Sequence, residues 1–223
     1  PPAVAIPAGS RNQPGQRLLV DYYHGMAINQ GQVTVCMSEP ALYEFWTRSA
    51  RALQQTLAPK RWFLSMDEIR GGGTCAACAA RNLTMGQILA DCIRRQCDII
   101  RAVCPEATIY IWSDMLDPNH NAHDNYYLAK GTFAGSWEGL PKDLVMVPWY
   151  FDKREQSMAF LAEHGFPTLA GSYYDGDTMD NIMGWLETCA RTRGCRGILY
   201  TTWQNKYGLL EAFGDAVSCP VSK

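Results

Sequence analysis

Short apolar runs alternate with longer amphipathic stretches along most of this chain. The runs are strand-length and mostly rich in β-branched or aromatic residues; they span 17–23, 61–66, 108–114, 143–151, 167–175 and 197–203. The stretches between them have apolar residues at helical spacing and predict helices over 41–57, 84–104, 153–164 and 178–193. Such alternation is typical of βα units, which build a parallel sheet.

Local signals predict where these helices begin and end. Ser38 is available as the N-cap of the first helix, and Pro59 follows its last turn. Pro105 closes the second helix, while Gly165 and Gly194 stand where the last two end, as glycines with a left-handed backbone often do.

Six strands exceed the needs of a small open sheet and fall short of an eight-stranded barrel. We therefore expect an α/β fold of the barrel type that is incomplete at its N-terminus. Residues 1–16 are Pro-rich and aperiodic and are expected to form a tail or linker, while 17–223 form the partial barrel domain.

The charge and composition of the chain limit the kinds of partner that we expect it to bind. The chain has 223 residues and a formal net charge of -2, and no basic run occurs in it. These features argue against a nucleic acid or an anionic membrane as partner, and no apolar run approaches the ~20 residues that cross a bilayer. We expect a small-molecule or glycan substrate. The oligomeric state is left open, and a secreted or periplasmic location is favoured over a cytoplasmic one.

The candidate chemistry lies where the apolar runs end, because active sites of parallel α/β folds form at the carboxyl ends of the strands. The run 61–66 leads into Asp67 and Glu68. The other ends combine aromatic residues with carboxylate, amide or imidazole groups: Asp21 to His24, Trp112 with Asp114, Trp149 with Tyr150, Tyr173 with Asp175, and Trp203 with Asn205. Aromatic walls with polar groups between them suit a sugar ring, and carboxylates among such walls suggest glycoside hydrolysis.

Asp67 and Glu68 are expected to play different roles. Successive residues of a strand point in opposite directions, so an adjacent pair cannot flank one bond as facing carboxylates unless the strand has already ended. Glu68 is the expected general acid, and Asp67 would orient another group of the substrate.

Taken in order, these strand ends resemble the β-N-acetylhexosaminidases of glycoside hydrolase family 20. Asp67–Glu68 matches the acidic pair after that family's fourth strand, and "WSDML" (112–116) is similar to its fifth strand end. The sixth, seventh and eighth ends are matched by Trp149, by Tyr173 with Asp175, and by Trp203 with Asn205; "VDYYHGMA", which includes His24, is loosely similar to the third-strand segment. The resemblance covers about residues 17–215.

The resemblance implies a (β/α)8 TIM-type barrel of which about strands 3 to 8 are present. It also implies removal of a terminal β-linked N-acetylhexosamine by a retaining, substrate-assisted mechanism without cofactor or metal. Asp67 would orient the 2-acetamido group, Glu68 would act as general acid and base, and Tyr173 would bind the acetamido oxygen. The tryptophans would enclose the sugar, and the remaining substrate-binding positions would be His24, Asp114, Asp175 and Asn205.

Two alternatives stay open. A non-catalytic carbohydrate-binding relative, or an inactive fragment, is suggested by Asn205 where the family has an acidic residue. The absence of His-x-Gly-Gly before the acidic pair, where this chain has 63–66, points the same way. A metal-dependent barrel enzyme using Asp67, Glu68 and His24 is the weaker alternative.

Two further motifs could bind a metal. Cys75 and Cys78 form a Cys-x-x-Cys pair, but zinc would require a second pair, and Cys92 and Cys97 have the wrong spacing. A structural loop clip is favoured over a metal site. The polar loop 120–125, "HNAHDN", could bind a metal or contact substrate from above the pocket.

Overall fold

A computed structural model describes residues 5–20, 34–173 and 175–218. The chain divides into two units, Pro1–Val33 and Thr34–Lys223. In the first unit the predicted strand 17–23 is wrong over its described part: residues 17–20 are exposed and form no strand, with Leu19 95% accessible. The rest of that run and His24 lie outside the described residues.

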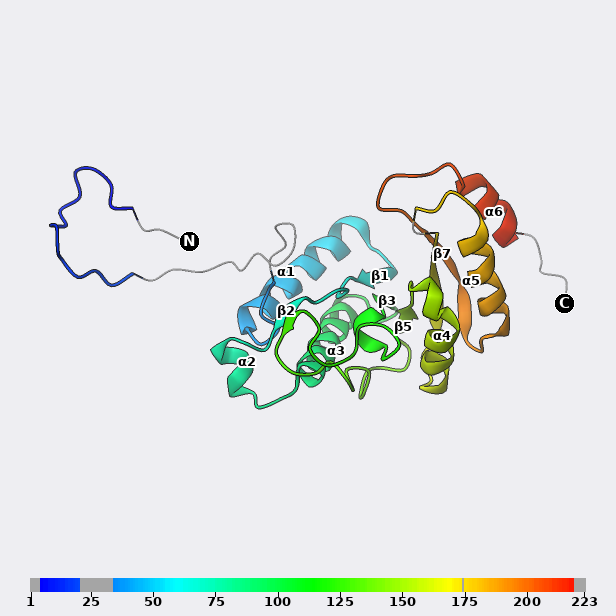
Figure 1. The fold of residues 1–223 in the computed structure, drawn as a ribbon, viewed down its shortest axis with the longest axis horizontal. Helices are drawn as coiled ribbons and strands as arrows, with labels where there is room; N and C mark the ends of the chain where they lie inside the picture. The colour runs from blue at the N-terminus through cyan, green and yellow to red at the C-terminus, as the bar shows by residue number, and fades with distance from the viewer. Residues whose placement is uncertain (1–4, 21–33, 174, 219–223) are drawn as a thin grey trace. The chain divides into compact units, whose positions relative to one another are not determined.

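The second unit contains a parallel sheet of five strands in the order β1-β3-β5-β6-β7 (Figure 1). Their bounds are Arg61–Leu64 for β1, Thr108–Trp112 for β3, Val145–Val147 for β5, Thr168–Tyr173 for β6 and Cys195–Thr201 for β7. Two further short strands, β2 (Gly71–Gly72) and β4 (Leu128–Ala129), pair with each other in parallel and form a separate two-stranded sheet. Five of the six predicted strands are thus confirmed, and the chain has an α/β fold with a mainly parallel central sheet.

The four predicted helices are also confirmed, as α1 (Pro40–Leu57), α3 (Met85–Val103), α4 (Arg154–Glu163) and α5 (Asp180–Arg191). The structure adds helices α2 (Ala76–Ala80) and α6 (Leu210–Ser218) and the 3-10 turns η1 (Asp114–Leu116) and η2 (Phe151–Lys153). Among the described residues, none of these helices is long and apolar enough to cross a membrane.

The cap predicted at Ser38 is wrong. The N-cap of α1 is Glu39, which makes no side-chain cap bond, and the helix begins at Pro40, whose fixed φ suits the first helical position. The Ser38 hydroxyl instead donates to the Cys78 sulfur at 3.3 Å. Gly165 directly follows the C-cap of α4 with φ of +78°, as predicted. Gly194 also has a positive φ, +82°, but it lies two residues beyond Thr192, the C-cap of α5.

One face of the sheet is covered by helices, and its opposite face is aromatic. Ile109 and Ile111 are buried in the core that includes α3, and Ala170 is buried with Trp185 of α5. Because side chains alternate along a strand, the residues between these point to the other face. There Phe63 contacts the rings of Tyr110 and Trp112, at centroid distances of 6.2 and 4.8 Å. This aromatic face leads to the carboxyl ends of the strands, where the candidate site lies.

Candidate functional site

The acidic pair lies in a loop, beyond the end of its strand. β1 ends at Leu64, and both Met66 and Glu68 have a left-handed backbone, with φ of +68° and +46°. Non-glycine residues in this conformation cost roughly 1–3 kcal/mol each and persist only where their surroundings hold them, and such positions are concentrated at functional sites. Strand alternation therefore does not constrain the directions of Asp67 and Glu68.

Asp114 fixes this loop to the neighbouring strand. It follows β3, is fully buried, and accepts the backbone N–H of Glu68 through Oδ2 at 2.8 Å. The side-chain amide of Asn121 donates to the same oxygen at 2.8 Å, and the Asn121 backbone N–H donates to the Asp114 carbonyl at 2.9 Å. The sequence predicted Asp114 as a substrate-binding residue but gave no signal for its bond to the acid loop or for Asn121.

The carboxyl group of Asp114 is strongly perturbed. Burial raises its pKa to about 7, and the negative charges of Asp67 and Glu68 add to this rise. The two hydrogen bonds to Oδ2 oppose the shift but do not cancel it. Oδ1 is buried without a hydrogen-bond partner in the described structure, which adds to the cost of ionising this carboxyl.

Glu68 forms an ion pair that the sequence did not predict. Its Oε2 lies 2.6 Å from Nη2 of Arg70, and the accessibility of the two side chains is 37% and 11%, respectively. The Arg70 guanidinium also lies 5.5 Å from the centre of the Tyr127 ring. Glu68 is thus partly open to solvent and held by a cation that is mostly buried.

Two of the predicted tryptophans, Trp112 and Trp149, converge over a glycine of β6. A Cβ atom added to Gly171 would lie 3.0 Å from the Trp112 ring and 3.2 Å from Cβ of Trp149. The absence of a side chain at Gly171 therefore lets the two residues approach this strand. His120, from the loop that the sequence predicted to contact metal or substrate, lies edge-on to Trp149 at 4.4 Å. Burial, with a smaller contribution from the charge of His123, lowers the pKa of His120 to about 4, so it is neutral at physiological pH.

Tyr173 makes its described contacts away from the acid loop. Its ring is 3% accessible and stacks on Tyr200 at 4.2 Å, and Tyr200 in turn contacts Phe213 of α6. The backbone has φ of +84°, and its N–H donates to Oδ1 of Asn181 at 2.7 Å. The described contacts do not join Tyr173 to Asp67, Glu68 or Asp114.

Asp175 organises the loop after β7. Its carboxylate accepts a short hydrogen bond from the Thr202 hydroxyl and the backbone N–H groups of Trp203 (2.7 Å) and Gln204 (3.2 Å). Burial works against ionisation, but these donors outweigh it and the pKa of Asp175 is lowered. Trp203 is 67% accessible, and Asn205 accepts from the Tyr207 hydroxyl at 3.3 Å. Asp175 and Trp203 thus form a second group, where β6 and β7 end, and the described contact of Asn205 is with Tyr207 alone.

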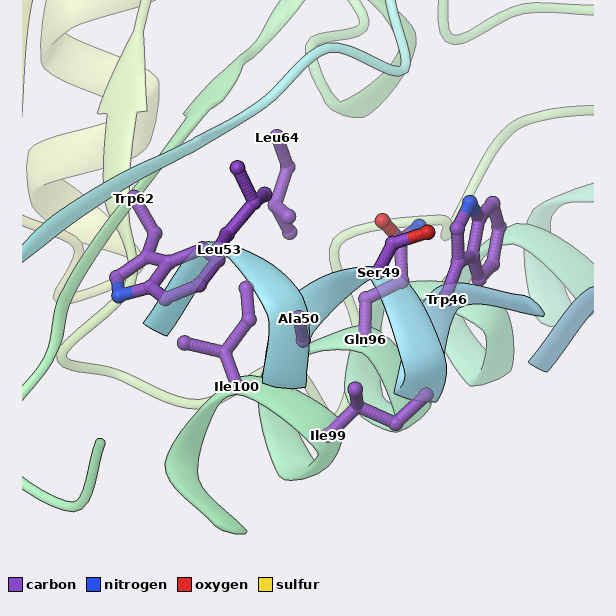
Figure 2. Close-up of a pocket in the computed structure, with 9 residues that line it drawn as sticks. All are labelled: Trp46, Ser49, Ala50, Leu53, Trp62, Leu64, Gln96, Ile99 and Ile100. Atoms are coloured by element: carbon purple, nitrogen blue, oxygen red, sulfur yellow. The ribbon is translucent and has the colours of Figure 1, made fainter. Parts of the chain in front are cut away.

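An apolar cavity of about 130 Å³ lies between α1, α3 and β1 (Figure 2). Trp46 and Leu53 of α1 face Ile99 and Ile100 of α3, with Trp62 closing one side. The lining contains no acidic or basic side chain, and it belongs to the helix-covered face. This cavity is therefore a gap in helix packing and does not form part of the acidic site.

No protein-family model matches this sequence, and a search of curated proteins finds no significant match. Functional inference accordingly rests on the geometry of the strand ends.

Proposed function

We propose that this chain is a glycoside hydrolase that removes a terminal β-linked N-acetylhexosamine by substrate assistance. The observation that carries the proposal is the bond from the Glu68 backbone to Asp114, which holds the acidic pair at the ends of two adjacent strands. The wall formed by Trp112 and Trp149 supplies the apolar surface that a sugar face requires. A catalytic carboxylate and an aromatic wall at one strand edge are what a glycosidase site needs.

In the proposed reaction the 2-acetamido oxygen of the substrate attacks the anomeric carbon. Asp67 accepts a hydrogen bond from the acetamido N–H, and Glu68 gives its proton to the leaving glycosidic oxygen. Water then opens the cyclic intermediate as Glu68 takes back a proton, which restores both the acetamido group and the acid. Arg70 has to move away from Glu68 when substrate binds, because Glu68 must be protonated to act as the acid.

The barrel form of the fold is part of the same proposal. Each strand of the five-stranded sheet pairs with the next in chain order, as strands of a (β/α)8 barrel do. In the described sheet β1 and β7 are the edges. Further strands paired to these edges would enclose the aromatic face as the interior of a barrel.

The test compares the wild-type chain with Glu68→Gln on a chromogenic β-N-acetylglucosaminide and on the matching β-glucoside. We expect turnover of the first substrate alone and a loss of about 10²-fold or more in the variant. Glu106→Gln replaces an exposed glutamate outside the site and is the matched control. Equal turnover by wild type and Glu68→Gln would refute the assignment of the acid.

A second candidate function is saccharide binding without hydrolysis. It is favoured by the Glu68–Arg70 ion pair, because a carboxylate held at 2.6 Å by a mostly buried arginine is engaged as an acceptor. Calorimetric binding of N-acetylglucosamine oligosaccharides without product release would support this function over the first. Product release lost in Glu68→Gln would exclude it.

A further inference from the structure

Three cysteines from two segments that are distant in the sequence meet in the second unit. Cys36 precedes α1, Cys75 is the N-cap of α2, and Cys78 lies within that helix. The Cys36 sulfur is 3.3 Å from that of Cys75 and 3.6 Å from that of Cys78, and all three sulfurs lie within 4.8 Å of one another. The sequence pointed to Cys75 and Cys78 but not to Cys36, which is 39 residues away from Cys75.

These separations fit one shared ion. Zinc binds thiolate sulfur at about 2.3 Å, so the sulfurs of a tetrahedral site lie about 3.8 Å apart. A disulfide would draw two sulfurs to about 2.05 Å and leave the third without a partner. Three sulfurs that converge on one point are therefore better explained by a common ligand than by a bond between two of them.

The surroundings of the sulfurs also suit a thiolate site. The backbone N–H of Cys78 donates to the Cys75 sulfur at 3.4 Å, and the Ser38 hydroxyl donates to the Cys78 sulfur at 3.3 Å. Donors of this kind stabilise negative charge on ligands and orient them. Cys78 is buried and Cys75 is exposed, so the site has an inner wall and a side open to solvent.

We propose that Cys36, Cys75 and Cys78 bind one zinc ion through three thiolates, with water as the fourth ligand on the exposed side. Soft thiolate ligands select Zn²⁺ and Cu⁺ over the harder divalent cations. The three thiols release three protons to solvent as the ion binds, and no electron is transferred.

The ion would connect two segments that lie far apart in the sequence. Cys36 lies at the start of the described second unit, and Cys75 follows the strand Gly71–Gly72, which begins directly after Arg70. Binding would therefore tie the segment before α1 to the loop that leads from the Glu68–Arg70 pair. This role is independent of the proposed hydrolysis, because none of the three cysteines reaches the acidic residues in the described contacts.

The first experiment measures metal in the full chain, purified under reducing conditions without chelator. We expect one zinc ion per chain by plasma mass spectrometry. After removal of zinc, Co²⁺ should give the visible and near-ultraviolet bands of tetrahedral cobalt thiolate. Cys36→Ser, Cys75→Ser and Cys78→Ser should each lose zinc and weaken these bands. The control Cys104→Ser removes a buried thiol that lies outside the cluster and should retain both.

A ligand-exchange variant keeps the test decisive if the serine variants fold poorly. Cys36→His retains a zinc ligand. It should still bind Co²⁺, with weaker sulfur-to-cobalt charge-transfer bands than the wild type because one thiolate is lost. Reduced wild-type protein without zinc or cobalt bands would overturn the proposal, as would full metal content in folded Cys36→Ser. A metal-free Cys36–Cys75 disulfide, found by mapping peptides without reductant, would overturn it as well.

Discussion

Asp114→Asn is the most informative substitution in this protein, because the wild-type carboxyl is fully buried beside two other acids. Its pKa rises from the ordinary 3.8 to about 7 in the folded protein. Between these values the folded state holds a proton that the unfolded state has released. Stability contributed by this group is therefore present at low pH and is lost as the pH rises through 7.

The magnitude follows from the size of the shift. Each pKa unit corresponds to about 1.4 kcal/mol, so titration of Asp114 should lower the free energy of unfolding by about 3 kcal/mol between pH 5 and pH 8. Asparagine cannot ionise, and its side-chain oxygen can still accept the bonds from Glu68 and Asn121. The free energy of unfolding of Asp114→Asn should therefore fall less between pH 5 and pH 8 than that of the wild type.

Urea denaturation of both proteins at pH 5 and pH 8 measures this difference, since the titration of groups that do not interact with Asp114 cancels in the comparison. Asp177→Asn is the control, because its carboxylate is 91% accessible and lies away from the cluster. The free energy of unfolding of Asp177→Asn should change with pH as that of the wild type does. If Asp114→Asn also follows it to within about 0.5 kcal/mol, the ionisable group responsible for the effect is not Asp114.

Three further predictions concern a close helix contact, a helix cap and the tryptophan wall. Gly86→Ala would place a methyl group 2.7 Å from the backbone oxygen of Ala134 and should cost about 1–3 kcal/mol in urea denaturation. Gly214→Ala, on a helix with open space, should instead gain up to about 1 kcal/mol; equal effects would contradict the packing argument. Thr84→Ala removes the capping box of α3 and should cost about 1 kcal/mol, which Thr84→Ser should restore; no loss would show that the cap is unimportant. Gly171→Ala should displace the tryptophan wall and change the near-ultraviolet circular dichroism with the far-ultraviolet spectrum intact; unchanged tryptophan signals would refute the contact.

Local sequence patterns were sufficient to predict most of the strands and helices of the second unit. The strands 61–64 and 108–112 and the helix 85–103 were predictable because apolar periodicity and caps act within a few residues. Asp67 and Glu68 could likewise be found as acids at a strand end. The same reasoning predicted a strand at 17–23, and it was wrong for residues 17–20, the described part of that run. These residues have a strand-like composition, but a strand forms only when another strand supplies its hydrogen bonds.

The main contacts of the candidate site and of the cysteine cluster join residues that are far apart in the sequence. Asp114 reaches the backbone of Glu68 across 46 positions, and Cys36 reaches Cys75 across 39. Neither pair has a local signature, because closing such a loop depends on the packing of the strands and helices between its ends. The order of strands and helices and the acids at the strand ends could be inferred from the residues alone, because the patterns that mark them are local. The buried carboxyl and the meeting of the thiols became apparent only in the folded chain, since burial and proximity depend on contacts made across the whole chain.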